Sequence, residues 1–248
     1  MLEHSPTAGA SGSHLFAGKP FRHLVSLGGN CDPALQLRRT GRHQTHGLFD
    51  WLVTPLDAIA QILADDGARL ATRFFAANSG TSAGCAEYGV LYHHEFPRGE
   101  HDVILFDAEG IARCRSKLRH KLARFIAVCS GADPVLFIRV WPETDLGWDR
   151  LGRGKTPARS ADLNALADAI AGRFPHLDFA VLVVTLDSDS HNDFGDPLDP
   201  RVAVQVLPQL ADRWSAGDAD WDGLLDQIVY VGEDQGEASG PAETLYWF

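Results

Sequence analysis

Apolar runs and amphipathic segments alternate along the chain, and this pattern predicts an α/β fold. Three runs of mainly branched apolar residues have the length of buried strands, over 24–27, 135–140 and 179–185. Apolar positions at helical spacing predict helices over 32–40, 55–66, 110–129, 160–171 and 218–228. The helix over 160–171 separates the second and third strands, and strand–helix–strand order is typical of parallel neighbours because a parallel pair needs a crossover. We therefore predict a mostly parallel central sheet flanked by helices.

The chain is expected to form one domain between two flanking segments. Residues 1–20 are rich in Gly, Ser, Ala and His without periodicity, which favours a flexible N-terminal leader, and 233–248 is expected to be a C-terminal tail. The residues between them, 21–232, show no repeat or long linker and are numerous enough for one hydrophobic core. Within this domain, segment 84–107 mixes aromatic, branched and turn residues and predicts a hairpin or an irregular sheet edge.

Composition and charge argue against several classes of function. The formal net charge of −11 repels polyphosphate, so we expect no nucleic-acid partner. The basic strip Arg113–Arg124 is the local exception; we interpret it as a solvated helix face, with an anion-binding surface as the alternative. No segment reaches the ~18 consecutive apolar residues of a membrane span and no secretory signal is found, so we expect a soluble cytoplasmic protein without a membrane partner.

Cys31 is the clearest candidate for a chemically reactive residue. The cysteines at 31, 85, 114 and 129 have neither metal-ligand spacing nor the density of a disulfide scaffold, so we expect them to be reduced. Cys31 follows the first strand and Gly28-Gly29-Asn30, and it precedes a helix with Pro33 in its first turn. The amide end of a helix favours a thiolate, so this thiol is expected to be nucleophilic near neutral pH. The alternative is a small buried cysteine at a tight turn.

The residues before Cys31 also have two interpretations. Gly29 and Asn30 are placed to present amide donors to an oxyanion, which makes them candidates for substrate binding. The structural alternative is that the two glycines permit the turn and Asn30 caps the helix.

The stretch Val25–Arg39, followed by Gly41 and Phe49-Asp50-Trp51, resembles the opening of a bacterial family named papain-like cysteine peptidases, whose function is unknown. Later blocks follow in the family's order: His94-Glu95-Phe96, where the family usually shows His-Asp-Phe, the strand over 135–140, and Gly217–Asp222. Leu48 also departs from the proline expected before Phe-Asp-Trp. The resemblance spans about residues 22–230 and implies that Cys31 is a nucleophile. A papain-type fold has a largely antiparallel sheet, whereas the apolar pattern here predicts parallel strands, with Cys31 at the edge where α/β proteins bind ligands.

A cysteine nucleophile needs a base and a group that orients the base. His94 is the first candidate because it lies in the family-like block, with His93 beside it as a substitute; both could instead belong to an exposed strand end. Asp50 is the candidate orienting group, although Phe49-Asp50-Trp51 is equally typical of a structural corner. His191 is a competing base in the polar loop after the third strand.

These residues predict a cysteine-dependent hydrolase or acyltransferase that acts on an acyl, amide or ester bond of a small-molecule or peptide substrate. Arg139, which ends an apolar strand, is a candidate for binding a substrate carboxylate or phosphate. We expect no cofactor and no metal, and the oligomeric state stays open. Two alternatives remain: a non-catalytic binding module of surface-polysaccharide or secondary-metabolite biosynthesis, and a metal-dependent glycosyltransferase that uses Asp187 and Asp189.

Overall fold

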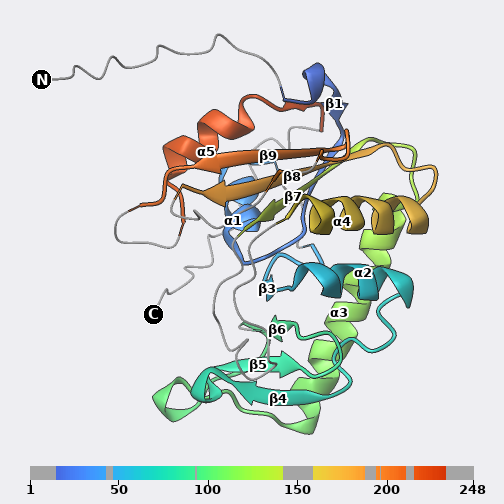
Figure 1. Ribbon diagram of the computed structural model, residues 1–248. Helices are drawn as coiled ribbons and strands as arrows, with labels where there is room; N and C mark the ends of the chain where they lie inside the picture. The colour runs from blue at the N-terminus through green and yellow to red at the C-terminus, as the bar shows by residue number, and fades with distance from the viewer. Residues whose placement is uncertain are drawn as a thin grey trace, which may run out of the picture.

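A four-stranded parallel sheet forms the centre of the protein (Figure 1). The computed structural model describes residues 15–42, 47–92, 94–141, 159–187, 194–195, 197–210 and 215–232. The sheet order is β2-β7-β8-β9, with all neighbours parallel. The strands are β2 His23–Ser26, β7 Val135–Val140, β8 Phe179–Leu186 and β9 Val202–Leu207. The predicted parallel sheet is thus confirmed, and β9 is a fourth strand that the apolar pattern did not reveal.

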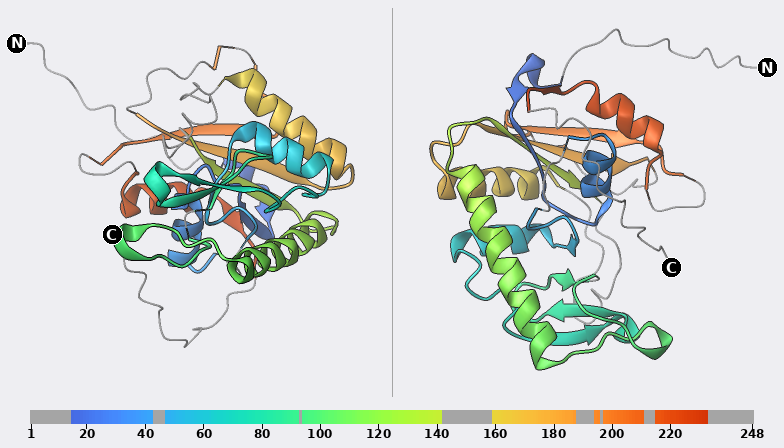
Figure 2. Two further views of the ribbon diagram at one scale, coloured as in Figure 1. Left: turned by 90° about the horizontal axis from the view of Figure 1, so that it is seen from below. Right: turned by 180° about the vertical axis from the view of Figure 1, so that it is seen from behind.

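Helices cover both faces of this sheet (Figures 1 and 2). On one face, Leu136 and Ile138 of β7 pack in a cluster with Leu37 and Trp221, which belong to α1 and α5. On the other face, Phe137 of β7 joins a larger cluster with residues of the remaining helices. The helices are α1 Asp32–Arg39, α2 Leu56–Ala64, α3 Ala108–Cys129, α4 Ser160–Arg173 and α5 Asp218–Leu225, which confirms all five predicted helices. None of the helices in the described ranges is both long enough and apolar enough to span a membrane.

A small antiparallel sheet lies beside the main layers, below them in Figure 1. Its order is β3-β6-β5-β4, and the β5–β6 hairpin begins two residues before the segment 84–107 that was predicted to be a hairpin or sheet edge. The strands are β3 Leu52–Val53, β4 Phe74–Ala77, β5 Ser82–Cys85 and β6 Leu91–Tyr92. Short elements complete the described chain: 3-10 turns at Leu15–Gly18, Asn78–Gly80 and Glu100–Asp102, and the parallel pair β1 Pro20–Phe21 with β10 Val229–Tyr230.

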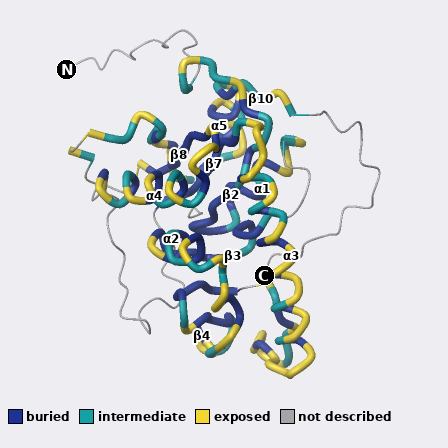
Figure 3. The backbone as a smooth tube through the Cα atoms, turned by 90° about the vertical axis from the view of Figure 1, so that its right-hand side faces the viewer, coloured by how far each residue is buried: buried dark blue, intermediate teal, exposed yellow. Residues whose placement is uncertain are grey.

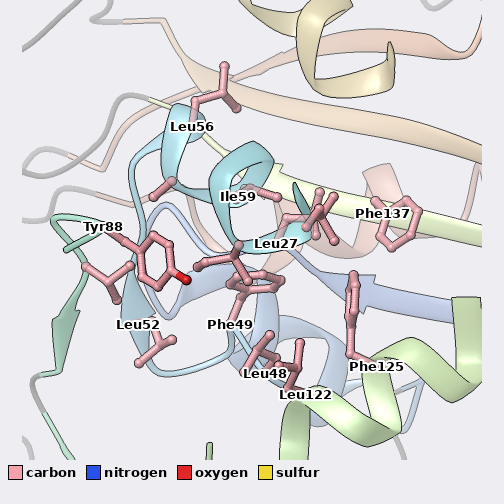
Figure 4. Close-up of a cluster of buried hydrophobic side chains, with 14 of the residues drawn as sticks. Leu27, Leu48, Phe49, Leu52, Leu56, Ile59, Tyr88, Leu122, Phe125 and Phe137 are labelled. Atoms are coloured by element: carbon pink, nitrogen blue, oxygen red, sulfur yellow. The ribbon is translucent and has the colours of Figure 1, made fainter. Parts of the chain in front are cut away.

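Helix α3 joins the two sheets, because its 22 residues run along both of them (Figure 2). One hydrophobic cluster contains Tyr92 of the antiparallel sheet, Leu118 of α3 and Phe137 of the parallel sheet. Figure 4 shows the part of this cluster that contains Leu27, Phe49 and Phe137, with Phe125 and Leu122 of α3 on the side of that helix. Figure 3 shows the burial of each residue along the backbone, with strands β7 and β8 buried and the outer faces of the helices exposed.

The basic strip on α3 is only partly a solvated face. Arg113, Lys117 and Arg119 are exposed, as the helical pattern predicted. Lys121 is not: its side chain is 5% exposed and lies among the inward residues of α3. The prediction that all charges of the strip face solvent is therefore wrong for Lys121, because position 121 follows Leu118 by three residues and shares its face.

Candidate active site

The turn between β2 and α1 depends on two glycines with left-handed backbone. Gly28 has φ +73° and Gly29 has φ +89°. A Cβ at Gly29 would lie 2.2 Å from the carbonyl oxygen of Val140, and one at Gly28 would lie 3.1 Å from that of Leu52. The turn therefore lies tightly between the end of β7 and the start of β3, and a side chain at Gly29 does not fit there.

Asn30 starts helix α1. Its side-chain oxygen accepts a hydrogen bond from the backbone N–H of Asp32 at 2.8 Å, and the residue is buried. This bond satisfies one of the free N–H groups of the first turn, as a cap does, although Asn30 stands one residue before the N-cap position, which Cys31 occupies. An oxyanion-binding role for Gly29 and Asn30 stays a prediction.

Cys31 differs from the other cysteines in its exposure. Among the four free cysteines it is partly exposed, whereas Cys85, Cys114 and Cys129 are buried. Burial nevertheless raises the pKa of the Cys31 thiol to about 11; the charge of Asp32 acts in the same direction, and the local backbone N–H opposes both. The expected resting thiolate is thus not found, because desolvation and a neighbouring carboxylate outweigh the helix end.

Asp32 is held in place by helix α5. The indole Nε1 of Trp221 donates a hydrogen bond to Asp32 Oδ2 at 3.1 Å, and both side chains are buried. Burial raises the pKa of Asp32 to about 6, although hydrogen bonds from Trp221 and Gln36 lower it. At the far end of α1, Arg39 pairs with Asp222 of α5 at 2.5 Å. The contacts of Gly217–Asp222 therefore hold α5 against α1, the helix that follows Cys31.

His94 is exposed and lies against Trp51. The two ring centroids are 5.7 Å apart at an interplanar angle of 80°, an edge-to-face contact. The guanidinium of Arg38 in α1 lies 5.7 Å from a ring centroid of the same tryptophan. Trp51 thereby connects the His94 segment to the helix that follows Cys31. Among the described residues, no histidine contributes to the pKa shift of Cys31.

Asp50 is completely buried in the corner that precedes β3. Its Oδ2 accepts a hydrogen bond from the backbone N–H of Gly47 at 2.6 Å, so the carboxylate stabilises this corner. The neighbouring Phe49 packs edge-to-face on Phe125 of α3 at 5.5 Å. The structural interpretation of Phe49-Asp50-Trp51 is therefore supported, and the orienting role of Asp50 stays a prediction.

Arg139 lies beneath the glycine turn. Its Nη1 donates to the carbonyl oxygen of Leu27 at 3.0 Å and its Nη2 donates to that of Thr54 at 2.7 Å. The guanidinium is fully buried and lies 5.8 Å from the ring centroid of Trp141. Arg139 thus links the end of β2 to the residue after β3, and its contact with a substrate stays a prediction.

The family model described as "Putative papain-like cysteine peptidase (DUF1796)" matches residues 22–189. The chain belongs to this family. No curated protein and no solved structure matches the chain. The match includes Cys31, Asp50, His94 and Arg139 but ends before α5, so the expected span to about residue 230 exceeds the matched region.

Several predicted residues of this family member lie outside the described residues, namely His93, His191 and Asp189. Asp187 is described: its Oδ1 accepts a hydrogen bond from the backbone N–H of Gln209 at 2.9 Å, which links the ends of β8 and β9. Within the described ranges, no three His, Cys, Asp or Glu side chains are grouped to hold a metal ion. The glycosyltransferase hypothesis gains no support from Asp187.

The sequence interpretation missed the burial of two residues, Asp32 and Lys121. Asp32 was visible only as the first residue of a helix, and nothing in its neighbours shows that Trp221, far along the chain, would bury it. Lys121 was assigned to the solvated face, although its spacing from Leu118 and Phe125 matches the inward positions of α3.

Proposed function

We propose that this family member is a cysteine-dependent hydrolase or acyltransferase with Cys31 as its nucleophile. The observation that carries the proposal is the exposure of Cys31, which alone among the four free cysteines is not buried. Its position at the carboxyl edge of the parallel sheet supports the proposal, because α/β proteins bind ligands outside this edge. The family name points to the same chemistry.

Because the resting group is a thiol, attack requires a base at the moment of reaction. His94 is the proposed base. As the Cys31 sulfur bonds to the acyl carbon, the thiol proton moves to the imidazole and the carbonyl electron pair moves to oxygen. The backbone N–H groups around Gly29 stabilise this oxyanion. Collapse expels the amine or alcohol, which takes the proton from the imidazolium and leaves a thioester on Cys31.

The second half of the reaction decides between hydrolase and transferase. Water or another nucleophile attacks the thioester, loses its proton to His94, and the returning thiolate takes that proton back. The products are an acid or a transferred acyl group and the original thiol. Asp50 is proposed to support this pair from the corner next to Trp51.

Acylation by p-nitrophenyl acetate tests the nucleophile. We expect a burst of p-nitrophenol from the native protein and an acetyl adduct on Cys31 in its mass spectrum. Cys31→Ala should abolish both, whereas Cys129→Ala, at a buried position on α3, should keep them. An equal burst from Cys31→Ala would refute the proposal.

The base is tested by comparing three histidine variants in the same assay. His94→Ala should slow the burst by about 10²–10⁴-fold, the usual loss when a general base is removed. His93→Ala and His191→Ala should stay close to the native rate. A loss confined to His191→Ala would transfer the role to that residue and reject His94.

A further inference from the structure

Lys121 is a buried cation that the proposed mechanism does not use. Its side chain is 5% exposed on the inner face of α3. Lysine is rarely buried unless its charge is compensated, because desolvation of an ammonium group is costly. The groups that compensate Lys121 therefore show why it lies inside the protein.

Glu95 is the first compensating group. Its side chain is 2% exposed, with Oε1 4.0 Å from the Lys121 ammonium and Oε2 2.9 Å from that of Lys117. Asp50 is completely buried, and its charge also acts on Lys121. Burial lowers the pKa of Lys121, and the charges of Glu95 and Asp50 oppose this shift. Glu95 thus faces two ammonium groups, of which Lys121 is buried and Lys117 is 51% exposed.

The two carboxylates belong to the two segments that meet at the proposed base. Asp50 precedes Trp51, Glu95 follows His94, and the Trp51 and His94 rings are in contact. The ladder between these segments is short, since β3 and β6 pair only Leu52 with Tyr92 and Val53 with Leu91. His94 lies beyond the last pair of this ladder, so strand pairing does not fix its position.

We propose that Lys121 is a positioning residue: its ammonium, buried beside Glu95, holds the His94 segment against the Asp50–Trp51 corner. The inference rests on the proposed function, because it treats His94 as the base. Its own claim concerns the location of the imidazole, which can be measured without any reaction. Lys121 acts through Glu95 and does not touch the reacting atoms.

The test compares Lys121→Met with Lys117→Met, which removes the same charge from the exposed side of the same carboxylate. NMR of the His94 imidazole reports its contact with Trp51 through the ring-current shift. Lys121→Met should move the His94 resonances toward those of a histidine without a neighbouring aromatic ring, and Lys117→Met should leave them near their native positions. Unchanged His94 resonances in Lys121→Met would overturn the inference.

The p-nitrophenyl acetate burst separates this inference from the proposed function. Lys121→Met should lower the burst rate by about 10–100-fold, as removal of a supporting group does, without changing which cysteine is acylated. If Cys31→Ala leaves the burst intact, the proposed function fails, while the NMR result still decides whether Lys121 positions the imidazole.

Glu95→Gln covers the case in which Lys121→Met does not fold. This variant keeps the shape of the side chain and removes the charge that faces Lys121. It should shift the His94 resonances in the same direction as Lys121→Met. A folded Glu95→Gln protein with native His94 resonances would also refute the positioning role.

Discussion

At the scale of single residues, burial and Asp32 together keep the adjacent thiol neutral. Burial raises the pKa of Cys31 and the charge of Asp32 adds to the shift, while burial raises the pKa of Asp32 itself to about 6. The pair therefore rests as a carboxylate next to a neutral thiol at pH 7.5. Such a site protects the sulfur from ionisation until a base acts on it.

Asp32→Asn should stabilise the protein at neutral pH. The folded pKa of about 6 lies above the usual 3.8, so the folded state binds more protons between these values and the free energy of unfolding falls as pH rises through this range. The shift corresponds to about 3 kcal/mol. An asparagine keeps an acceptor for Trp221 and does not ionise, so it avoids this loss of stability. In urea unfolding, the free energy of unfolding of Asp32→Asn should exceed that of the native protein by the full amount at pH 7.5 and by almost nothing at pH 4.

Asp226→Asn is the control, because it removes the same charge at an exposed site that pairs with Arg42. The stability of this variant should differ from native by less than about 1 kcal/mol at both pH values. Alkylation by iodoacetamide should also become faster at Cys31 in Asp32→Asn, because the opposing charge is gone. Equal stability profiles of Asp32→Asn and the native protein would show that Asp32 carries no ionisation cost.

The sequence identified Cys31 but not its ionisation state. A strand, two glycines and a helix start are all local features, so the junction can be predicted from the residues around position 31. Burial of Asp32 depends on Trp221, which is contributed by a helix near the other end of the chain. A local pattern contains no information about such a distant contact, and the same reason explains why the pairing of Lys121 with Glu95 was missed.

At the scale of elements, the β2–α1 turn is constrained by its neighbours more than by its own dihedral angles. Gly29 and Gly41 both have left-handed backbone, with φ +89° and +69°. Gly41 follows the end of α1, where a Cβ would have no atom of the described residues within 4 Å, whereas Gly29 faces the carbonyl of Val140. An alanine at position 41 therefore tests backbone strain alone, whereas an alanine at position 29 tests strain together with a steric clash.

Gly29→Ala should cost about 2–5 kcal/mol of the free energy of unfolding, because strain and overpacking add. Gly41→Ala should cost about 1 kcal/mol, since strain acts alone there. Urea unfolding of both variants measures the difference. Equal costs would mean that the end of β7 moves away from the turn without resistance.

The helices and central strands could be predicted because each is long enough for its period to be counted. The antiparallel sheet could not be predicted in the same way, since β3 and β6 have two residues each and present no alternation. Strand β9 is an edge strand with partly exposed side chains, so it lacks the continuous apolar run that identified β7 and β8.

At the scale of the whole molecule, one core joins the parallel and antiparallel sheets. Leu118 is fully buried on α3 in the cluster that includes Tyr92 and Phe137. The proposed nucleophile follows strand β2 of the parallel sheet, and the proposed base follows strand β6 of the antiparallel sheet. Their relative position therefore depends on α3, and we predict that the two sheets unfold together as a single domain.

Leu118→Ala tests this cooperativity, because it removes buried contacts from the helix that both sheets share. The variant should lose about 2–5 kcal/mol, and native-state hydrogen exchange should show the same loss for amides of β5 and of β7. Leu105→Ala, at an exposed position in the loop before α3, should change either value by less than about 0.5 kcal/mol. If Leu118→Ala accelerated exchange in β5 and left β7 unchanged, the antiparallel sheet would open separately, and α3 would not couple the base to the nucleophile.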